Sequence, residues 1–344
     1  MRFVLFGAAA APPTCLRVGA LLPSGSVADV SAAAAKAGAP ALTSMRVFLE
    51  AGAAGRAWAA AAVADAASHV DLAAAGLVLR APIYDPHKVR AAHPLAAARA
   101  SPTRRHRRCR RRRRCHRCRS HSPPPRARVQ VICVGMNYVD HCTEQNQPIP
   151  VEPVLFNKFA TSIIGPGEVI ARPPETEQLD FEVELVIVMG APARRVPLAA
   201  ALETVAGYTV AHDVSARDLQ LKKNGGQWML GKAIDGFAPL GPAIVTPDEV
   251  GDVHALRLRC LVNGEVMQDG NTRELVHNVP AIIAYASKFM TLLPGDVILT
   301  GTPPGVGCFR KPPVWLKAGD VVTCEIEKIG AITNTIVDEV LPKA

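Results

Sequence analysis

Two glutamates, two positions apart in an otherwise apolar run, constrain the fold of this chain more than any other feature. Glu182 and Glu184 open a run that continues to Met189 in Val, Leu, Ile and Met. Side chains of a β-strand alternate between its two faces, so both carboxylates point one way while Val183 and Leu185 point the other. The run therefore predicts a strand. Taken alone, the same pattern also suits an ordinary strand with one face in water.

A third carboxylate, Asp213, follows a second apolar run, Tyr208 to Ala211. Three carboxylates held by sheet backbone suit a hard cation with oxygen ligands, and they favour Mg²⁺ or Mn²⁺ over zinc because no Cys or His is needed. The string HDVSARDLQ then places Arg217 and Gln220 four and three residues further on. On a short helix after Asp213 these intervals predict one polar face. Arg217 could bind a substrate carboxylate with its guanidinium fork, and Gln220 could donate to a carbonyl oxygen.

Three other segments carry candidate site residues. Lys232 lies in WMLGKAIDGF, where burial and nearby carboxylates would move its pKa in opposite directions, unless it is a surface lysine. His141 and Glu144 are three residues apart, so in a helical turn the carboxylate can fix one imidazole nitrogen and make the other a better base. An ordinary structural pair is the alternative. The loop ILTGTPPGVG lacks a nucleotide-binding signature. We expect it to bring backbone N–H groups and the Thr302 hydroxyl close to a small anionic ligand.

The chain divides into three regions by composition. Residues 1–88 are rich in Ala, begin with a candidate strand, MRFVLFG, and have helical patterns near 31–37 and 45–67, which predict a small N-terminal α+β domain. Residues 131–340 contain many short strand patterns and two helical ones, at 197–207 and 280–290. Asn-Gly at 263–264 is a hairpin turn signal. We therefore predict an α+β fold that is mostly β, with the catalytic domain at 131–340.

The third region, residues 90–130, is an Arg-rich segment with fifteen Arg and no acidic residue. It accounts for the net charge of +9, because the rest of the chain has 24 basic and 30 acidic residues. Such a string repels itself and buries no apolar surface, which predicts a disordered insertion. Clustered Arg could instead bind nucleic acid, which we consider the less favoured partner. A further alternative is zinc held by three Cys and one His: Cys109, Cys115, Cys118 and His121.

Composition also bears on the compartment. No apolar run reaches the ~18 residues that span a bilayer, so we expect a soluble protein without a membrane partner. The remaining six cysteines have no paired spacing, which favours a reducing compartment over a disulfide scaffold. The first 28 residues contain Arg2 and Arg17 but no acidic residue, which is compatible with an import signal. The cytoplasm remains an alternative location.

The motifs E-x-E, HDVSARD, the Gly-Lys pair and TGTPxG, in this order, resemble the fumarylacetoacetate hydrolase family over residues 131–340. The fuller strings CVGMNYVDHCTEQN and KFATSIIGP are similar to a mitochondrial subgroup associated with oxaloacetate tautomerisation. The resemblance implies a mixed β-sandwich roll, normally a homodimer, that binds a divalent metal through Glu182, Glu184 and Asp213. It further implies that Arg217, Gln220 and Lys232 contact the substrate. His141 and Glu144 would form a His–Glu dyad on a lid.

We therefore expect a Mg²⁺-dependent enzyme, with Mn²⁺ or Ca²⁺ as alternative ions, that acts on a short 2-oxo diacid. The leading hypothesis is keto–enol tautomerisation of oxaloacetate through a metal-stabilised enolate, with Lys232, or His141 and Glu144, moving the proton. The alternatives are C–C bond hydrolysis of an acylpyruvate, decarboxylation of oxaloacetate, and, from another class, nucleic-acid binding through the Arg-rich segment.

Overall fold

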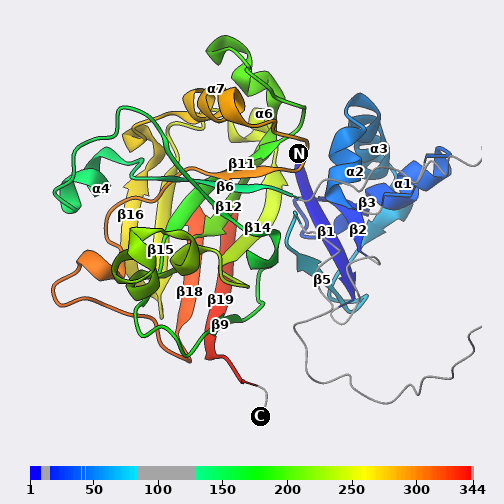
Figure 1. Cartoon of the computed structure of the whole chain (residues 1–344). Coiled ribbons are helices and arrows are strands. Elements are labelled where there is room, and N and C mark those ends of the chain that lie inside the picture. Colours follow the sequence, from blue (N-terminus) through cyan, green and yellow to red (C-terminus); the bar gives the residue numbers. More distant parts are fainter. Residues whose placement is uncertain (9–15, 40, 43, 84–128, 342–344) are drawn as a thin grey trace, which may run out of the picture.

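The structure is a computed structural model, shown in Figure 1. It describes residues 1–8, 16–39, 41–42, 44–83 and 129–341. The Arg-rich segment lies outside these ranges apart from Val129 and Gln130. The predictions that this segment is disordered, binds zinc or binds nucleic acid therefore concern residues outside the described ranges. Within the described ranges, no helix has both the length and the apolar character needed to cross a membrane.

The N-terminal residues form an α+β unit at one side of the molecule, on the right in Figure 1. Its elements are β1 (Arg2–Ala8), β2 (Arg17–Leu21), β3 (Val27–Asp29), α1 (Val30–Lys36), α2 (Met45–Glu50), α3 (Ala53–Ala64), the 3₁₀ turn η2 (Ala66–Ser68), β4 (His69–Val70) and β5 (Leu77–Arg80). The helical pattern predicted at 45–67 is split because Gly52, at a φ of 53°, separates α2 from α3. The unit joins the rest of the fold through β1.

One large sheet runs through the whole molecule. Its order is β4-β3-β2-β1-β14-β12-β11-β17-β6-β7, with β5 beside β1 and β8 beside β14. Its later strands are β6 (Val131–Gly135), β7 (Val154–Lys158), β8 (Ile163–Ile164), β11 (Val183–Met189), β12 (Val205–His212), β14 (Ala238–Val245) and β17 (Val297–Leu299). The N-terminal unit enters it because Arg2 and Phe3 pair with Val245 and Ile244 of β14. The domain boundary near residue 88 stays a prediction.

A second sheet packs against strands β11, β12 and β14 of the first. Its order is β16-β15-β18-β19-β9, formed by β9 (Ile170–Arg172), β15 (Arg257–Val262), β16 (Glu265–Asn271), β18 (Val321–Ile326) and β19 (Gly330–Asp338). The predicted Asn-Gly turn at 263–264 connects β15 to β16. A two-stranded ribbon, β10 (Leu179–Asp180) with β13 (Ser215–Ala216), completes the strands of the described residues. The predicted mostly-β sandwich is confirmed.

Strand β11 lies at the centre of this arrangement and is buried on both faces. Val183, Leu185 and Ile187 belong to the core between the two sheets, whereas Val186 and Val188 belong to the core that includes the N-terminal unit. The alternation predicted from the sequence is therefore present, but neither face is in water. Glu184, on the same face as Val186 by parity, is a buried carboxylate.

Helices are short in the part of the chain after residue 128. They are α4 (Val139–Glu144), α5 (Met229–Lys232), α6 (Pro247–Val250) and α7 (Val279–Phe289), with 3₁₀ turns η3 (Ala160–Ser162), η4 (Leu198–Thr204), η6 (Asn224–Gly226), η7 (Thr272–Glu274) and η8 (Gly307–Phe309) and a π-helical turn η5 (Asp218–Lys222). Helix α7 confirms the prediction at 280–290. The helix predicted at 197–207 is a 3₁₀ turn instead, because residues from Val205 onward pair with β11.

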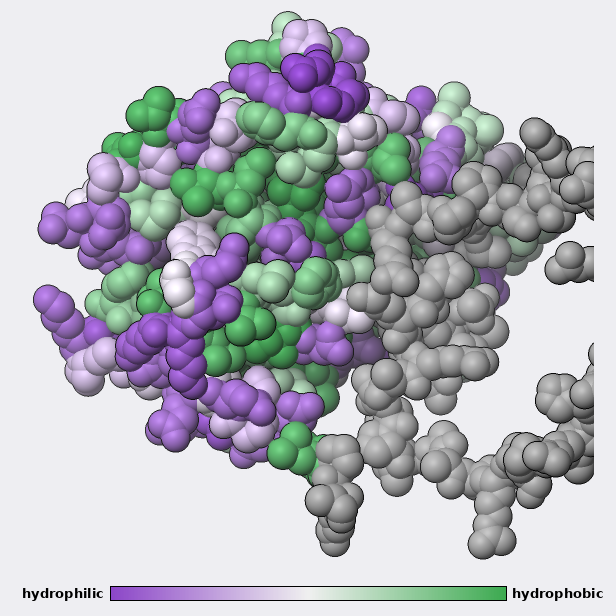
Figure 2. All heavy atoms as spheres, viewed as in Figure 1, coloured by the Kyte–Doolittle hydropathy of each residue, from purple (hydrophilic) through white to green (hydrophobic). Residues whose placement is uncertain are grey.

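The outer surface alternates hydrophilic and hydrophobic residues in small patches on the face shown in Figure 2. Scattered apolar side chains of this kind are ordinary on a protein surface. The five cysteines among the described residues are all free thiols.

Candidate metal centre and active site

Three carboxylates meet in the interior at the end of the central strands. Glu184 lies on β11, Glu182 directly precedes that strand, and Asp213 directly follows β12. One oxygen from each lies within 4.8 Å of the others. The side chains are buried, with residue exposures of 5%, 2% and 0% for Glu182, Glu184 and Asp213. The ordinary wet-faced strand considered from the sequence is therefore wrong for this run.

The electrostatic surroundings of these carboxylates differ. Burial raises the pKa of Glu184 well above its ordinary value, and the neighbouring charges of Asp213 and Glu182 raise it further. Burial also acts to raise the pKa of Glu182, but the charges of Lys232 and Arg217 outweigh it and lower that pKa to about 2. The surroundings of Glu184 therefore disfavour its ionised form, whereas those of Glu182 favour it.

These residues fit a divalent cation. All the ligand atoms are oxygens, the donor type that Mg²⁺, Mn²⁺ and Ca²⁺ prefer. Asp213 Oδ1 is buried and accepts no hydrogen bond, although Lys158 Nζ lies 2.7 Å away as an ion pair. Lys158 therefore compensates this oxygen, and the fit to a divalent ion rests on the three carboxylate oxygens that converge within 4.8 Å. The donor set thus has the chemistry of a hard-metal site.

Lys232 lies at the end of the short helix α5 and points its ammonium group into the carboxylate cluster. Its Nζ is 2.7 Å from Glu182 Oε2 and 3.0 Å from Asp213 Oδ2. Burial acts to lower the pKa of Lys232, but Asp213 and Glu182 outweigh it, so the pKa is raised. The two opposing effects expected from the sequence are both present, and the carboxylates win. Lys232 is a buried cation and not a surface lysine.

Arg217 is held differently from the prediction. No helix joins it to Asp213, because Ser215 and Ala216 form strand β13, which pairs with β10. Arg217 precedes the π-helical turn η5, and its NH1 donates to Gln220 Oε1 at 2.9 Å. Its NH2 donates to Glu182 Oε1 at 2.5 Å. Arg217 and Gln220 therefore do meet, but the guanidinium is bound mainly by protein groups rather than left open as a fork.

Two site residues were missed by the sequence reasoning. Asp180, on β10, accepts from Arg217 Nε at 2.8 Å and is fully buried. Lys158, at the end of β7, forms the ion pair with Asp213 and donates to the backbone carbonyls of Val214 and Phe237 at 3.1 and 2.9 Å. The available signals were a charged residue ending an apolar strand, VLFNK, and an aspartate two positions before Glu182.

The predicted His–Glu pair is formed on α4. His141 Nδ1 lies 2.8 Å from Glu144 Oε2, so Nδ1 donates to the carboxylate and Nε2 is the nitrogen left to act as a base. Glu144 Oε1 also accepts from the backbone N–H of Gly305 at 2.9 Å, which ties α4 to the loop after β17. The ring of Phe309 packs edge-on against His141 with centroids 6.0 Å apart.

The loop after β17 holds Glu184 through its backbone and bonds the Thr302 hydroxyl to other protein groups. The backbone N–H of Gly301 donates to Glu184 Oε2 at 2.7 Å. The Thr302 hydroxyl donates to the carbonyl of Val183 at 2.9 Å and accepts from Gln268 at 2.8 Å. Thr302 still lines the pocket described next, so its predicted contact with substrate stays a prediction, although its hydroxyl is already engaged.

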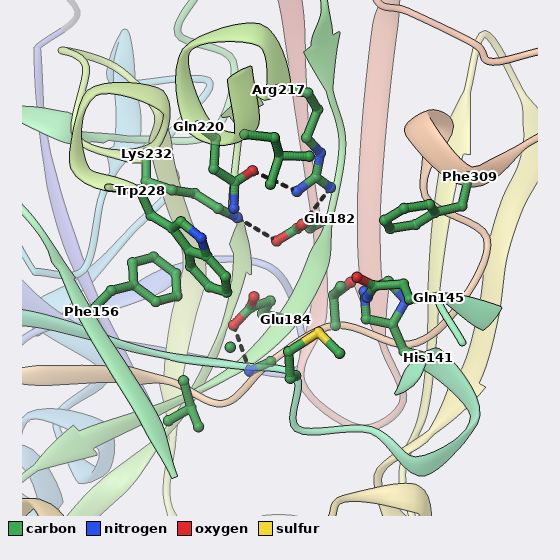
Figure 3. Close-up of a pocket in the computed structure, with 16 residues that line it drawn as sticks. His141, Gln145, Phe156, Glu182, Glu184, Arg217, Gln220, Trp228, Lys232 and Phe309 are labelled. Carbon is green, nitrogen blue, oxygen red and sulfur yellow. Dashed lines mark hydrogen bonds and ion pairs between the residues drawn. The ribbon is translucent and has the colours of Figure 1, made fainter. Parts of the chain in front are cut away.

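A single pocket brings these groups together, as Figure 3 shows. Its cavity volume is about 60 Å³, measured as the space open to the centre of a water molecule. Phe156 and Trp228 stand on one side, with ring centroids 5.4 Å apart, and Phe309 stands with His141 on the other. The charged and amide groups lie between these walls: Glu182, Glu184, Arg217, Gln220 and Lys232. Polar groups between aromatic walls suit a small anionic substrate.

Comparison with known proteins agrees with this site. Residues 130–337 match the family model described as "Fumarylacetoacetate (FAA) hydrolase C-terminal". The chain is 60% identical over 208 residues to the Xenopus laevis protein named oxaloacetate tautomerase fahd2, mitochondrial. That match covers 60% of this chain and 65% of the relative, so the chain spans less than two thirds of the length of this curated relative.

Two solved structures are also similar. The fumarylacetoacetate hydrolase of Exiguobacterium antarcticum is 32% identical with a TM-score of 0.70, over 98% of this chain and 100% of that one. The fumarylpyruvate hydrolase of Pseudomonas aeruginosa, solved in complex with Mn²⁺ and pyruvate, is 32% identical with a TM-score of 0.57. That similarity covers 62% of this chain and 91% of the hydrolase.

Proposed function

The chain belongs to the fumarylacetoacetate hydrolase family, and we propose that it is a metal-dependent enzyme that tautomerises a short 2-oxo diacid, with oxaloacetate as the first candidate. The observation that carries the proposal is the convergence of three buried carboxylates with Lys232 and His141 on one pocket. The name of the Xenopus laevis relative supports oxaloacetate as the substrate.

Glu182, Glu184 and Asp213 would hold the metal, which we propose to be Mg²⁺, with Mn²⁺ and Ca²⁺ as alternatives. Mn²⁺ is the ion in the related fumarylpyruvate hydrolase structure. When bound, a divalent cation supplies Lewis-acid stabilisation of the negative charge that develops on the 2-oxo oxygen as a C3 proton leaves.

The protein groups would handle the substrate charge and the proton. Lys232, kept as an ammonium ion by Glu182 and Asp213, adds positive charge beside the same oxygen. His141 lines the pocket with Nδ1 fixed by Glu144, so its Nε2 is the candidate base for the C3 proton. Arg217 has five N–H donors, and three of them are used by the described residues, which leaves two for a substrate carboxylate.

The direct test follows the enol absorbance of oxaloacetate in buffer containing Mg²⁺. Wild-type protein should accelerate the approach to keto–enol equilibrium, and Glu184→Gln should lose that acceleration by ~10²-fold or more because a charged ligand is removed. Glu203→Gln is the matched control, since Glu203 is exposed on η4 and should keep full activity. Equal rates with and without wild-type protein would rule out the tautomerase.

C–C bond hydrolysis of an acylpyruvate is the second candidate, favoured by the His141–Glu144 pair at 2.8 Å, which could activate a water. Oxaloacetate decarboxylation would use the same metal and pocket. In a panel of acylpyruvates and 2-oxo acids, His141→Ala should lower a hydrolase activity by ~10²–10⁴-fold if His141 activates the water. A tautomerase in which His141 takes the C3 proton would also lose activity in this variant, so the products separate the two activities: a cleaved acylpyruvate for the hydrolase, and the other tautomer of oxaloacetate for the tautomerase.

We further propose a mitochondrial location and a homodimer. The location is suggested by the name of the Xenopus laevis relative and is checked by fractionating cells that express the tagged protein. The homodimer follows from the family resemblance. Exposed apolar side chains on the adjacent η4 and α7, Leu198, Leu202 and Phe289, are candidates for its contact surface. Light scattering of the eluted protein should then give twice the chain mass of 36.5 kDa.

A further inference from the structure

We propose that Asp180 is a positioning residue that couples the Arg217 guanidinium to the segment 305–309, which carries the pocket residue Phe309. Asp180 touches neither the pocket nor the three-carboxylate cluster directly, and its effect is transmitted through Arg217 and through the loop that carries Phe309. The kinetic part of its test rests on the function proposed above, and the structural part does not.

Asp180 is a fully buried carboxylate with an unusually complete set of donors. Oδ1 accepts from the backbone N–H groups of Phe181 and Gly307, at 2.8 and 2.7 Å. Oδ2 accepts from Arg217 Nε at 2.8 Å and from the N–H of Cys308 at 3.1 Å. One side chain thus joins β10, the turn η8 and the segment that begins at Arg217. A carboxylate is the only side chain of this size that can accept all four.

Both groups joined by Asp180 belong to the pocket. Arg217 continues from Asp180 to Glu182, donating at 2.5 Å to the same carboxylate that Lys232 binds. The turn η8 ends at Phe309, which lines the pocket and packs against His141. The contact between the turn and Asp180 is also close, because a Cβ at Gly307 would lie 2.6 Å from Asp180 Oδ1. The carboxylate therefore sets the position of a wall residue and of an arginine at the same time.

Asp180→Asn tests this coupling with almost no change in volume. An amide has one oxygen, so whichever way it is turned, two of the four donors lose their acceptor and face an N–H group instead. We expect the Arg217 guanidinium and the 305–309 segment to shift, and kcat/KM for oxaloacetate to fall ~10–100-fold, as is typical when a partner of an active-site group is removed.

The matched control is Asp296→Asn. Asp296 is also fully buried and accepts from the N–H of Gln130 and of Leu293 at 3.0 and 2.8 Å, but it does not line the pocket. It should lose stability as Asp180→Asn does while keeping wild-type kcat/KM. A general loss of packing would instead lower kcat/KM in both variants.

A double-mutant cycle with Arg217→Lys separates positioning from an independent role. If Asp180 acts through Arg217 as well as through the 305–309 segment, the loss of kcat/KM in the double variant should be clearly smaller than the product of the two single losses. Losses that multiply would overturn the inference. A crystal structure of Asp180→Asn decides the matter without any assay, since an unmoved Arg217 and an unmoved 305–309 segment would also overturn it. If wild-type protein proves inactive on oxaloacetate, the proposed function is wrong. The crystal structure of Asp180→Asn then still tests whether Asp180 positions Arg217 and the 305–309 segment.

Discussion

The pocket is surrounded by charged side chains that are buried in the protein interior. Four buried carboxylates, from Asp180 to Asp213, are matched by three buried cations, Lys158, Arg217 and Lys232. Each cation contacts a carboxylate that other groups also contact. Removal of one cation therefore leaves a buried carboxylate with less compensating charge, which is costly in a protein interior.

Lys158 gives the clearest prediction at this scale. Lys158→Met keeps the side-chain length but removes the ion pair with Asp213 and the donors to the carbonyls of Val214 and Phe237. We expect the metal-free protein to lose about 3–5 kcal/mol of unfolding free energy, measured by urea denaturation. Lys222→Met is the control, because Lys222 is exposed and bonds only Gln178 among the described residues. A loss below ~1 kcal/mol in Lys158→Met would contradict the account.

Among the elements, the turn after β17 links backbone geometry to the metal site. Gly301 has a φ of +99°, its N–H binds Glu184, and a Cβ there would lie 2.9 Å from the Cβ of Asn137. Gly301→Ala should destabilise the fold by at least about 1–3 kcal/mol through backbone strain. It should also weaken Mn²⁺ binding by ~10-fold or more, measured by calorimetry, because Glu184 loses its fixed partner.

Gly319 provides the control for that prediction. Its φ is +96°, almost the same as that of Gly301, but nothing lies within 4 Å of a Cβ built there. Gly319→Ala should therefore carry the backbone strain without any change in Mn²⁺ affinity. If both variants bind Mn²⁺ as the wild type does, the Gly301 turn has no role in holding Glu184.

The strands and the three carboxylates were predictable because the information is local. A period of two in the 182–189 run fixes which side chains share a face, whatever the rest of the chain does. The segment after Asp213 was predicted as a helix from spacing alone, yet residues 215–216 pair with β10, which lies more than thirty residues earlier. Asp180 and Lys158 were missed for the same reason, because their local signals do not reveal the partners, Arg217 and Asp213, that lie far away in sequence.

At the scale of the whole molecule, the Arg-rich segment is expected to be dispensable. We predict that a variant lacking residues 90–128 stays folded and keeps the metal-dependent activity. Val129 and Gln130 are retained because Gln130 binds Asp296 through its backbone N–H and its side chain. Each halving of a loop stabilises the fold by only about 0.6 kcal/mol, so the variant should be at least as stable as the parent. Circular dichroism during heating and the oxaloacetate assay check this.

A second variant, with residues 90–128 replaced by a Gly/Ser linker of equal length, separates loop length from the Arg content. Both variants should behave alike in stability and activity. Unfolding of both would show that the segment is part of the fold. If the parent binds RNA with a steep salt dependence and both variants do not, the nucleic-acid alternative gains direct support.

The pairing of β1 with β14 bears on how the protein is made. Arg2 and Phe3 meet partners near position 245, so this part of the edge of β1 stays unpaired while more than half of the polypeptide is still being translated, although β5 pairs with the rest of that edge. At ~5–20 residues per second, that wait lasts roughly 10–50 s. We expect ribosome-stalled chains that end before residue 245 to be digested readily by protease and to need chaperones. Chains long enough to expose β14 outside the ribosome should become resistant.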